Sequence, residues 1–426
     1  MKHLFLSVIT LAMSGMLTAS AQNYKFDFSS GKKVKEGYIK INADNMFNQQ
    51  TGYGYDLLPA PDGKNTRPFY FSVTVPDGNY HVIALVGSAK TAAATTVRGE
   101  SRRLFFENIK TKKGEYKSCS FVINKRNPQI SEKEKVRIKK RELSKLNWDD
   151  KLTIEINGDA PQLAELIIER TDNIPTLFLC GNSTVVDQDN EPWASWGQMI
   201  TRFFNDSVCI ANYAESGESA NTFIGAGRLK KALSQMKKGD YLFVEFGHND
   251  QKQTGPGKGA YYSFAYSIKQ YIDEARAKGA HPVLVTPTRR RHWSPDNKTI
   301  LDTHENYPAA IREIAARENV PLIDLQEITK VLYEAMGEKE SRKAFVHYPA
   351  GTYPGQTQAL EDNTHFNTFG AYEIAKCVIE EIKKAVPELT CYLRPYPAFN
   401  PAHPDNPAEF HWNPSPFTEI EKPDGN

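Results

Sequence analysis

The sequence has few cysteines, almost no excess charge, and no internal apolar run long enough to span a bilayer. Its five cysteines are scattered and none belongs to a Cys-x-x-Cys pair, which indicates neither a zinc ribbon nor a thioredoxin-type site. Because the number is odd, at least one cysteine is free or pairs between chains, and a Cys377–Cys391 bridge stays open. A net charge of +2 over 426 residues gives no argument for a nucleic acid partner. The His-Glu-x-x-His pattern of zinc hydrolases is absent as well.

The beginning of the chain differs from the rest. A basic start over residues 1–3 precedes an apolar run over residues 4–17, which is too short for a membrane span, and the small residues Ala19-Ser20-Ala21 follow. This pattern predicts a secretory signal peptide over residues 1–21, cleaved before Gln22. No cysteine lies near the cleavage point, so we expect a periplasmic or extracellular protein without a lipid anchor and without a membrane partner.

Residues 22–172 have the pattern of an all-β domain. Apolar and polar residues alternate in short runs over residues 67–87, 102–110, 116–124 and 150–158, separated by Pro-Asp-Gly and Asn-Gly turns. This predicts a β-sandwich. The charged residues 131–150 mix both signs and are expected to form a solvated loop or hairpin face rather than a nucleic-acid surface. Tyr53, Tyr55 and Tyr70 are expected in packing, with stacking on sugars as the alternative.

Residues 173–392 alternate between strand and helix patterns. Strands are expected at 176–180, 207–213, 240–247, 281–288 and 320–325, and helices at 261–279, 305–318 and 370–386. Such alternation predicts an α/β domain with a parallel sheet covered on both faces. Residues 393–426 form a Pro-rich tail without a periodic pattern, which we expect to wrap over the surface.

Polar residues follow several of these strands, where ligands bind in open parallel sheets. Ser183 follows the first strand, Gly217 the second and Asn249 the third, while Asp362 and His365 are expected after the last strand, before the closing helix. A serine needs a base to become a nucleophile, and Asp362 lies three residues before His365, close enough to orient it. We expect Ser183, Asp362 and His365 to be catalytic, with an oxyanion hole made by the backbone amides of Ser183 and Gly217 and the Asn249 side chain.

Four motifs carry a family resemblance. The chain resembles the SGNH/GDSL hydrolase superfamily in its four sequence blocks, which are Ser183 in GNST, Gly217 in SGES, Asn249 in GHND and His365 in DNTH. Further segments are similar to those of its rhamnogalacturonan acetylesterase branch: GHNDQK, WASWGQM, and TPTRRRHW with THENYPAAIREIA. The resemblance implies a flavodoxin-like three-layer α/β/α fold, no metal or other cofactor, and removal of acetyl groups from pectic polysaccharide. GYGYD, VPDGNYHV and ESRRLFFENI resemble the galactose-binding-like β-sandwich that precedes the catalytic domain in several bacterial members.

One position departs from the family, whose first block usually has aspartate where this chain has Asn182. Asparagine makes similar local hydrogen bonds but carries no charge, so we expect activity to survive.

Several residue roles stay open. Trp193 and Trp196 are expected on a helix after the serine, packed in the core, with a sugar platform as the alternative. A further four residues are candidates for substrate binding, with structural or solvated roles as alternatives: His248, Arg289, Arg290 and Arg291. A basic cluster suits a polyanionic pectin, because arginine pairs well with carboxylates.

Three rival functions also stay open. One is an acetylesterase for xylan or another glycan. Another is a carbohydrate-binding protein whose hydrolase domain is inactive. The third is a metal hydrolase that uses His248, Asp250, Asp362 and His365.

Overall fold

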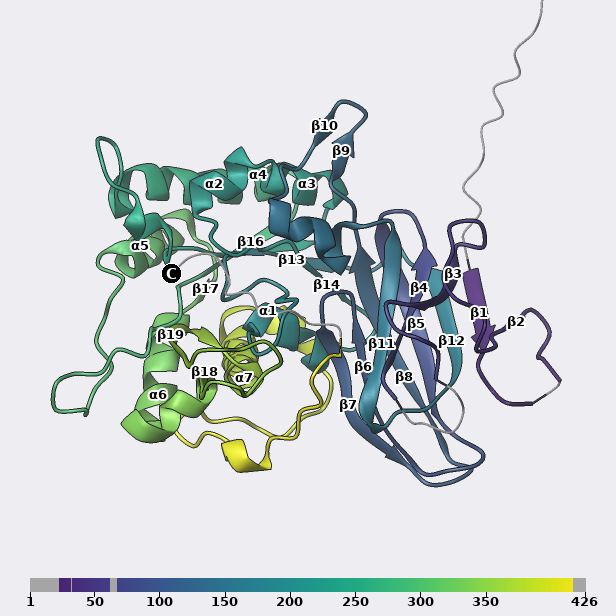
Figure 1. Ribbon diagram of the computed structural model, residues 1–426. Coiled ribbons are helices and arrows are strands. Elements are labelled where there is room, and N and C mark those ends of the chain that lie inside the picture. Colours follow the sequence, from purple (N-terminus) through teal and green to yellow (C-terminus); the bar gives the residue numbers. More distant parts are fainter. Residues whose placement is uncertain (1–22, 32, 62–66, 417–426) are drawn as a thin grey trace, which may run out of the picture.

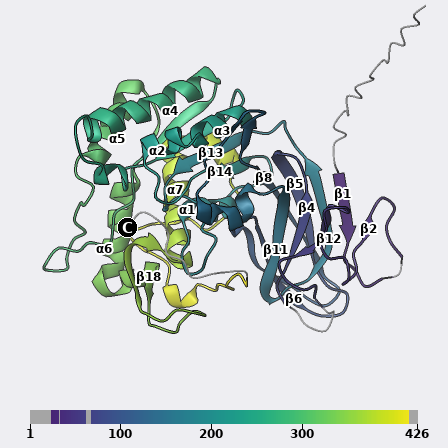
Figure 2. The same cartoon turned by 45° about the horizontal axis from the view of Figure 1, so that its top comes forward.

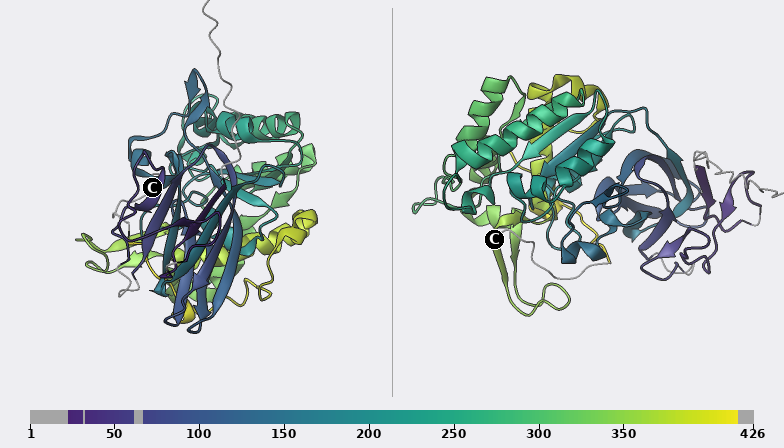
Figure 3. Two further views of the ribbon diagram at one scale, coloured as in Figure 1. Left: turned by 90° about the vertical axis from the view of Figure 1, so that its right-hand side faces the viewer. Right: turned by 90° about the horizontal axis from the view of Figure 1, so that it is seen from above.

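The computed structural model describes residues 23–31, 33–61 and 67–416. The predicted signal peptide, residues 1–21, lies outside the described residues. A β-rich part, built from the first half of the chain, stands beside a part that combines strands and helices (Figures 1 and 3). None of the described helices is both long enough and apolar enough to cross a membrane.

The β-rich part contains two sheets whose inner faces share one apolar core. The first sheet has the order β3-β4-β11-β6-β7 and is antiparallel; β8, β5, β12, β1 and β2 belong to the second. Val82 and Leu166 from the second sheet pack in the same core as Phe71 and Ile154 from the first. The strand bounds are β1 (Asn23–Asp27), β2 (Ile39–Lys40), β3 (Tyr53–Asp56), β4 (Phe69–Thr74), β5 (Gly78–Gly87), β6 (Ala93–Gly99), β7 (Arg103–Thr111), β8 (Tyr116–Lys125), β11 (Lys151–Ala160) and β12 (Leu163–Arg170).

The α/β part is built on five parallel strands in the order β17-β16-β15-β13-β14. Side chains alternate between the two faces of a strand. In β13, Leu177 and Leu179 therefore pack in one core, and Phe178 and Cys180 pack in the other. The bounds are β13 (Thr176–Gly181), β14 (Cys209–Asn212), β15 (Tyr241–Glu245), β16 (His281–Val285) and β17 (Leu322–Ile323).

Helices cover both faces of these parallel strands, which makes the three layers expected from the sequence (Figures 1 and 2). One face is covered by α2 (Ala220–Gly225), α3 (Arg228–Gln235), α4 (Ala265–Ala277) and α5 (Tyr307–Glu318). The other is covered by α1 (Trp196–Met199), α6 (Leu325–Ser341) and α7 (Thr368–Ala385). Helix α6 was not among the helices expected from the sequence, and Gly337 interrupts it with a left-handed φ of 79°.

The two parts share one sheet. Strand β14 of the α/β part pairs in parallel with β8 of the β-rich part at Ile210 and Ile123. The ten-stranded order is therefore β17-β16-β15-β13-β14-β8-β5-β12-β1-β2. The predicted domain boundary at residues 172–173 falls between β12 and β13 and stays a prediction.

The charged segment 131–150 differs from its expected form. Its first residues lie in a hairpin of β9 (Gln129–Ser131) and β10 (Glu134–Lys135), but short 3₁₀ turns follow over Lys140–Ser144 and Leu146–Trp148. Glu142 and Lys145 are buried there. Their charges are compensated, because Glu142 pairs with Arg228 and Lys145 pairs with Glu215. The expectation of a solvated segment is wrong for this second stretch.

The described part of the tail, residues 393–416, returns to the β-rich part. Arg394 donates to the backbone oxygens of Phe105 and Ser120, each at 2.8 Å. Further along, Ser415 Oγ donates to Glu155 Oε2 at 2.7 Å. All five cysteines are free thiols, so the Cys377–Cys391 bridge that the sequence left open does not form.

Candidate active site

Ser183 stands in the turn that directly follows β13. The backbone oxygen of Asn182 accepts hydrogen bonds from the amides of Val185, at 3.1 Å, and Val186, at 3.0 Å, so the chain reverses immediately beyond the sheet. Gly217 and Asn249 follow β14 and β15, the two strands that flank β13. Because the carboxyl ends of parallel strands meet at one edge, all three predicted residues lie at the same edge.

Ser183, His365 and Asp362 form a hydrogen-bonded series. His365 Nε2 lies 2.8 Å from Ser183 Oγ, and His365 Nδ1 lies 2.7 Å from Asp362 Oδ2. Burial raises the pKa of the Asp362 carboxyl, but the hydrogen bond and charge of His365 outweigh it and hold that pKa below its usual range. An ionised Asp362 places the proton on Nδ1, which leaves Nε2 free to accept the serine proton.

Asp362 and His365 lie in a strand rather than in the loop expected from the sequence. Strand β19 (Leu360–Phe366) pairs with β18 (Phe345–Tyr348) in a separate two-stranded antiparallel sheet. The register shifts between the pairs Phe345↔Phe366 and Val346↔Asp362, so three residues of β19 bulge out of the pairing. Asp362 Oδ1 accepts the amides of Thr364, at 2.8 Å, and His365, at 2.9 Å, which stabilises the bulge. A bulge redirects side chains, and here it brings the carboxylate and the imidazole together.

Three hydrogen-bond donors were predicted for an oxyanion. Gly217 adopts φ 77°, a left-handed conformation that favours glycine. Across the described ranges, no acceptor is recorded for the backbone amides of Ser183 or Gly217. Asn249 Nδ2 donates to the Glu218 oxygen at 3.0 Å, which ties the two loops together. A side-chain amide has two protons, so one Asn249 donor remains for a ligand.

A buried polar chain lies behind the serine turn. Thr184 Oγ1 is 2.8 Å from Asn182 Oδ1 and 2.6 Å from Glu245 Oε1, while Trp196 Nε1 donates to Glu245 Oε2 at 2.6 Å. A hydroxyl has one proton, so both Thr184 contacts are hydrogen bonds only when Glu245 is itself protonated and donates to Thr184. Burial raises the pKa of Glu245 to about 7, in agreement with this arrangement. Asn182 Oδ1 also accepts the Thr184 amide at 3.0 Å, so its role here is a local turn contact that needs no charge.

His248 and Asp250 are engaged within the protein. His248 Nδ1 lies 2.9 Å from His304 Nε2, and burial holds the pKa of His248 well below its usual value. Asp250 accepts the backbone amides of Ala220 at 2.8 Å and Gly247 at 2.9 Å, and burial raises its pKa to about 7. No group of three or more metal-ligating side chains occurs in the described part of the chain.

The three arginines predicted to bind substrate contact other groups of the protein. Arg289 is buried and donates to Glu327 Oε1 at 3.0 Å, and Arg291 is buried and pairs with Glu338 Oε1 at 2.5 Å. Both guanidinium groups thus have carboxylate partners within the protein, and their role in substrate binding stays a prediction. Arg290 is half-buried, and its Nη1 donates to Thr303 Oγ1 at 3.0 Å.

Arg291 has a different relation to the site, which the sequence did not reveal. Its Nη1 atom donates to Asn363 Oδ1 at 3.1 Å, and its backbone amide donates to the Asn363 oxygen at 2.8 Å. Asn363 belongs to the bulge of β19, so Arg291 supports the strand that carries Asp362 and His365.

The aromatic candidates are packing residues. Trp193 and Trp196 are both buried, but only Trp196 lies on helix α1; Trp193 lies in the preceding loop, contrary to expectation. Tyr55 and Tyr70 are buried, and Tyr53 is half-buried with its ring centroid 5.2 Å from that of Phe26.

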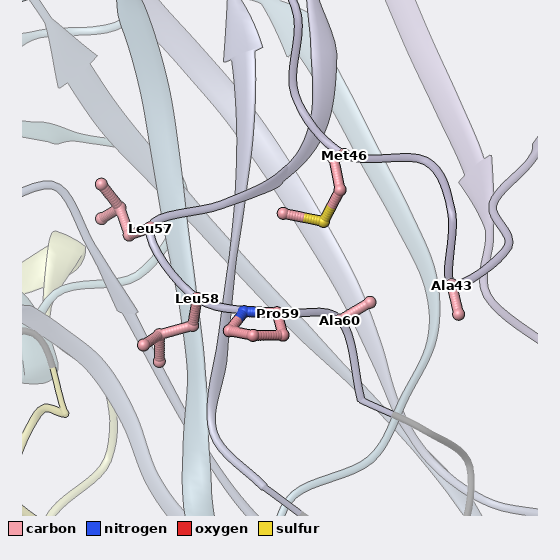
Figure 4. A pocket seen from close by; sticks show the side chains of 6 residues that line it. All are labelled: Ala43, Met46, Leu57, Leu58, Pro59 and Ala60. Atoms are coloured by element: carbon pink, nitrogen blue, oxygen red, sulfur yellow. The ribbon is translucent and has the colours of Figure 1, made fainter.

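An apolar hollow in the β-rich part contains none of the predicted site residues. Figure 4 shows the residues that line it: Ala43, Met46, Leu57, Leu58, Pro59 and Ala60. None of these side chains offers an acid, a base or a nucleophile, so the hollow lacks the chemistry of the Ser183 region.

Comparisons with known proteins identify relatives of this chain. The model of the GDSL-like Lipase/Acylhydrolase family matches residues 179–372. The rhamnogalacturonan acetylesterase RhgT of Bacillus subtilis is 42% identical over 210 residues, which cover 49% of this chain and 89% of RhgT. The uncharacterized esterase YxiM of the same organism is 23% identical over 414 residues, which cover 90% of this chain and 97% of YxiM. The crystal structure of YxiM covers 85% of this chain and 98% of its own, with 24% identity and a TM-score of 0.46.

Proposed function

The chain belongs to the GDSL-like lipase/acylhydrolase family and is a carboxylic ester hydrolase, and we propose that it removes O-acetyl groups from the pectic polysaccharide rhamnogalacturonan. The observation that carries the proposal is the series in which His365 lies 2.8 Å from Ser183 Oγ and 2.7 Å from Asp362 Oδ2. The substrate class rests on the likeness to RhgT, which is named a rhamnogalacturonan acetylesterase.

The proposed first half-reaction forms an acetyl-enzyme. Ser183 Oγ attacks the acetyl carbonyl carbon while His365 Nε2 takes the serine proton, and Asp362 stabilises the imidazolium. The carbonyl oxygen becomes an oxyanion that faces the amides of Ser183 and Gly217 and the Asn249 side chain. As the tetrahedral intermediate collapses, the bond to the sugar oxygen breaks, and His365 returns the proton to that oxygen.

The second half-reaction regenerates the serine. His365 Nε2 takes a proton from water, and the resulting hydroxide oxygen attacks the carbonyl carbon of acetyl-Ser183. The same donors face the second oxyanion. Collapse breaks the bond to Ser183 Oγ, which recovers a proton from His365, and acetate leaves.

Acetate release from a panel of acetylated polysaccharides tests both the reaction and the substrate. Acetylated rhamnogalacturonan, homogalacturonan and xylan are compared at equal acetyl concentration, with Ser183→Ala as the control. We expect release that is fastest from rhamnogalacturonan and is lost in the variant. Faster release from xylan would replace the substrate proposal, whereas release by Ser183→Ala would overturn the nucleophile assignment.

The same panel of polysaccharides also distinguishes an esterase from an inactive carbohydrate-binding protein. If the wild-type protein releases no acetate and a fluorophosphonate does not label Ser183, the ester hydrolase chemistry proposed for this chain is wrong.

We also propose that the protein is secreted, which rests on the sequence of residues 1–21 alone. Expression in a bacterial host followed by amino-terminal sequencing of the exported protein tests this. The expected first residue is Gln22, and an exclusively intracellular protein that retains Met1 would contradict the proposal.

A further inference from the structure

Two loops carry the nucleophile and the predicted oxyanion glycine. Side chains from the β-rich part reach the first loop, and side chains from the charged segment reach the second. We call residues 184–195 the nucleophile loop, because they follow Ser183, and residues 213–219 the glycine loop, because they contain Gly217. The two parts stand side by side in Figure 3, and several of their polar contacts cross this junction.

Arg102 holds the nucleophile loop. It lies in the turn between β6 and β7, and its Nη1 atom donates to the backbone oxygens of Gln188, at 3.1 Å, and Trp193, at 2.9 Å. Its Nη2 atom pairs with Glu191 Oε1 at 2.7 Å. Gln188 Nε2 in turn donates to the backbone oxygen of Ser183 at 2.8 Å. Two hydrogen-bonding steps therefore connect a residue of the β-rich part to the nucleophile's own peptide group.

Arg103, the first residue of β7, binds the same loop. Its Nε atom lies 2.6 Å from Asp187 Oδ2, and neither side chain has any exposed surface. Asp187 Oδ1 accepts from Asn212 Nδ2 at 2.8 Å, so the pair also connects the nucleophile loop to the end of β14. Buried charges of this kind are tolerated only when they are paired, because desolvation of a lone charge is costly.

The second stretch of the charged segment holds the glycine loop. Lys139 Nζ donates to the Ser216 oxygen at 2.5 Å and lies 3.3 Å from Glu218 Oε1. Arg141 contacts Glu215 and donates to the same Ser216 oxygen at 3.2 Å. Lys139 and Arg141 thus both donate to the peptide group that joins Ser216 to Gly217.

Glu215 is the buried centre of these contacts. Lys145 Nζ lies 3.2 Å from Glu215 Oε2, and both side chains are almost completely buried. Burial opposes ionisation of Glu215, but the charges of Lys145, Arg228 and Arg141 outweigh it and lower its pKa to about 2. The carboxylate therefore stays charged, and the ion pairs persist at any pH where esterases are assayed.

We propose that residues ahead of the α/β part in the chain position the active site: Arg102 of the β-rich part orients the nucleophile loop, and Lys139, Arg141 and Lys145 of the charged segment orient the glycine loop. The proposal rests on the ester hydrolase function proposed for Ser183. These basic residues are positioning residues, because they act on the reaction through Ser183 and Gly217 and not on the substrate. The β-rich part then contributes to turnover of any ester, including one too small to reach a second binding site.

Lys139→Met is the first test variant, because the Lys139 side chain is 29% exposed and its loss is tolerated by folding more readily than loss of a buried charge. The substrate is p-nitrophenyl acetate, which lacks a sugar. We expect kcat to fall by about 10-fold or more, since displacement of an oxyanion donor removes transition-state stabilisation, while KM changes less than about 2-fold. Lys139→Arg keeps a donor and a charge and is expected to recover most of kcat.

Arg102→Met tests the nucleophile loop, with Arg102→Lys as the variant to use if the first does not fold. We expect a similar loss of kcat and slower labelling of Ser183 by a fluorophosphonate. Asp206→Asn is the matched control, because Asp206 contacts Ser120 and His81 across the same junction but touches neither loop. Its kcat is expected to stay within about 2-fold of the wild type, whatever the change in melting temperature.

The proposal is overturned if Lys139→Met and the folded Arg102 variant keep kcat within about 2-fold, or if Asp206→Asn loses as much activity as they do. A wild-type protein that hydrolyses no ester and is not labelled at Ser183 would instead contradict the proposed function, so the two failures are distinguishable.

Discussion

His365 Nε2 lies 2.8 Å from Ser183 Oγ although 182 positions separate the two residues in the chain. Ser183 is presented by the turn after the parallel strand β13, and His365 by a bulged strand of a separate antiparallel sheet. Each element alone places an ordinary polar side chain, and their meeting places the proposed base beside the proposed nucleophile.

Asp362→Asn tests the role of the carboxylate. Asn keeps the Oδ1 atom that accepts the Thr364 and His365 amides, so the bulge is expected to fold normally. Its amide group, however, donates toward His365 Nδ1 and favours the tautomer whose Nε2 carries a proton. We expect kcat to fall by about 10³- to 10⁴-fold, as in other hydrolases with this triad. Kinetics with p-nitrophenyl acetate measure this, and a loss below about 10-fold would refute the assigned role.

Gly217→Ala tests the glycine loop. Alanine at φ 77° strains the backbone and is expected to tilt the amide that faces the oxyanion, lowering kcat by about 10-fold or more. Gly114→Ala is the control, because Gly114 has φ 81° with nothing within 4 Å of an added Cβ and lies between β7 and β8, away from the site. Both variants should lose about 1 kcal/mol of stability. Equal kcat values for the two variants would argue against the glycine's role.

Glu245→Gln tests the buried polar chain through the pH dependence of stability. Folding raises the pKa of Glu245 from its usual 4.5 to about 7, so the folded state binds this proton more tightly than the unfolded state. The resulting stability is complete below about pH 4.5 and is lost as the pH rises through 7. Gln cannot ionise, and its side chain can donate to Thr184 and accept from Trp196, as protonated Glu245 does.

The expected result is a variant that matches the wild type at pH 5 but is more stable by about 3 kcal/mol at pH 9, because each unit of pKa difference corresponds to about 1.4 kcal/mol. Urea unfolding at the two pH values measures this difference. A variant that is equally destabilised at both values would show that Glu245 is charged in the folded protein.

Removal of divalent metals is expected to leave the activity unchanged. In the proposed mechanism, Asp362 and His365 activate the serine directly, and amide groups donate hydrogen bonds to the oxyanion. No step therefore requires a Lewis acid. The measurement compares kcat before and after dialysis against EDTA, with and without added zinc. Loss of activity that zinc restores would favour the rival metal hydrolase.

Physical differences between elements explain which sequence predictions succeeded. Strands such as β13 and β15 carry continuous apolar runs, because both of their faces are buried, and such runs are recognisable without a structure. The helix α6 was missed although Leu325, Ile328 and Leu332 follow a helical spacing, and Gly337 breaks the pattern near its end. The bulge in β19 depends on pairing with β18, which local sequence does not encode.

The arginine cluster shows the same limit for function. Three successive arginines suggested a surface for acidic sugars, but the partners of Arg289 and Arg291 come from helix α6, which was not among the helices expected from the sequence. Whether a charge faces solvent or a carboxylate is decided by the element packed against it.

The sequence by itself identified the candidate site residues, because Ser183, Gly217, Asn249, Asp362 and His365 stand in motifs whose residue types and order suit ester hydrolysis. The turns that carry Ser183, Gly217 and Asn249 are local, so neighbouring residues suffice to form them. Only the tertiary structure decided that a bulge brings His365 to Asp362, that Arg291 supports this bulge, and that Arg102 of the β-rich part and Lys139 of the charged segment bind the two loops. These contacts join residues distant in the chain, and their geometry depends on how sheets and helices pack, which no local pattern records.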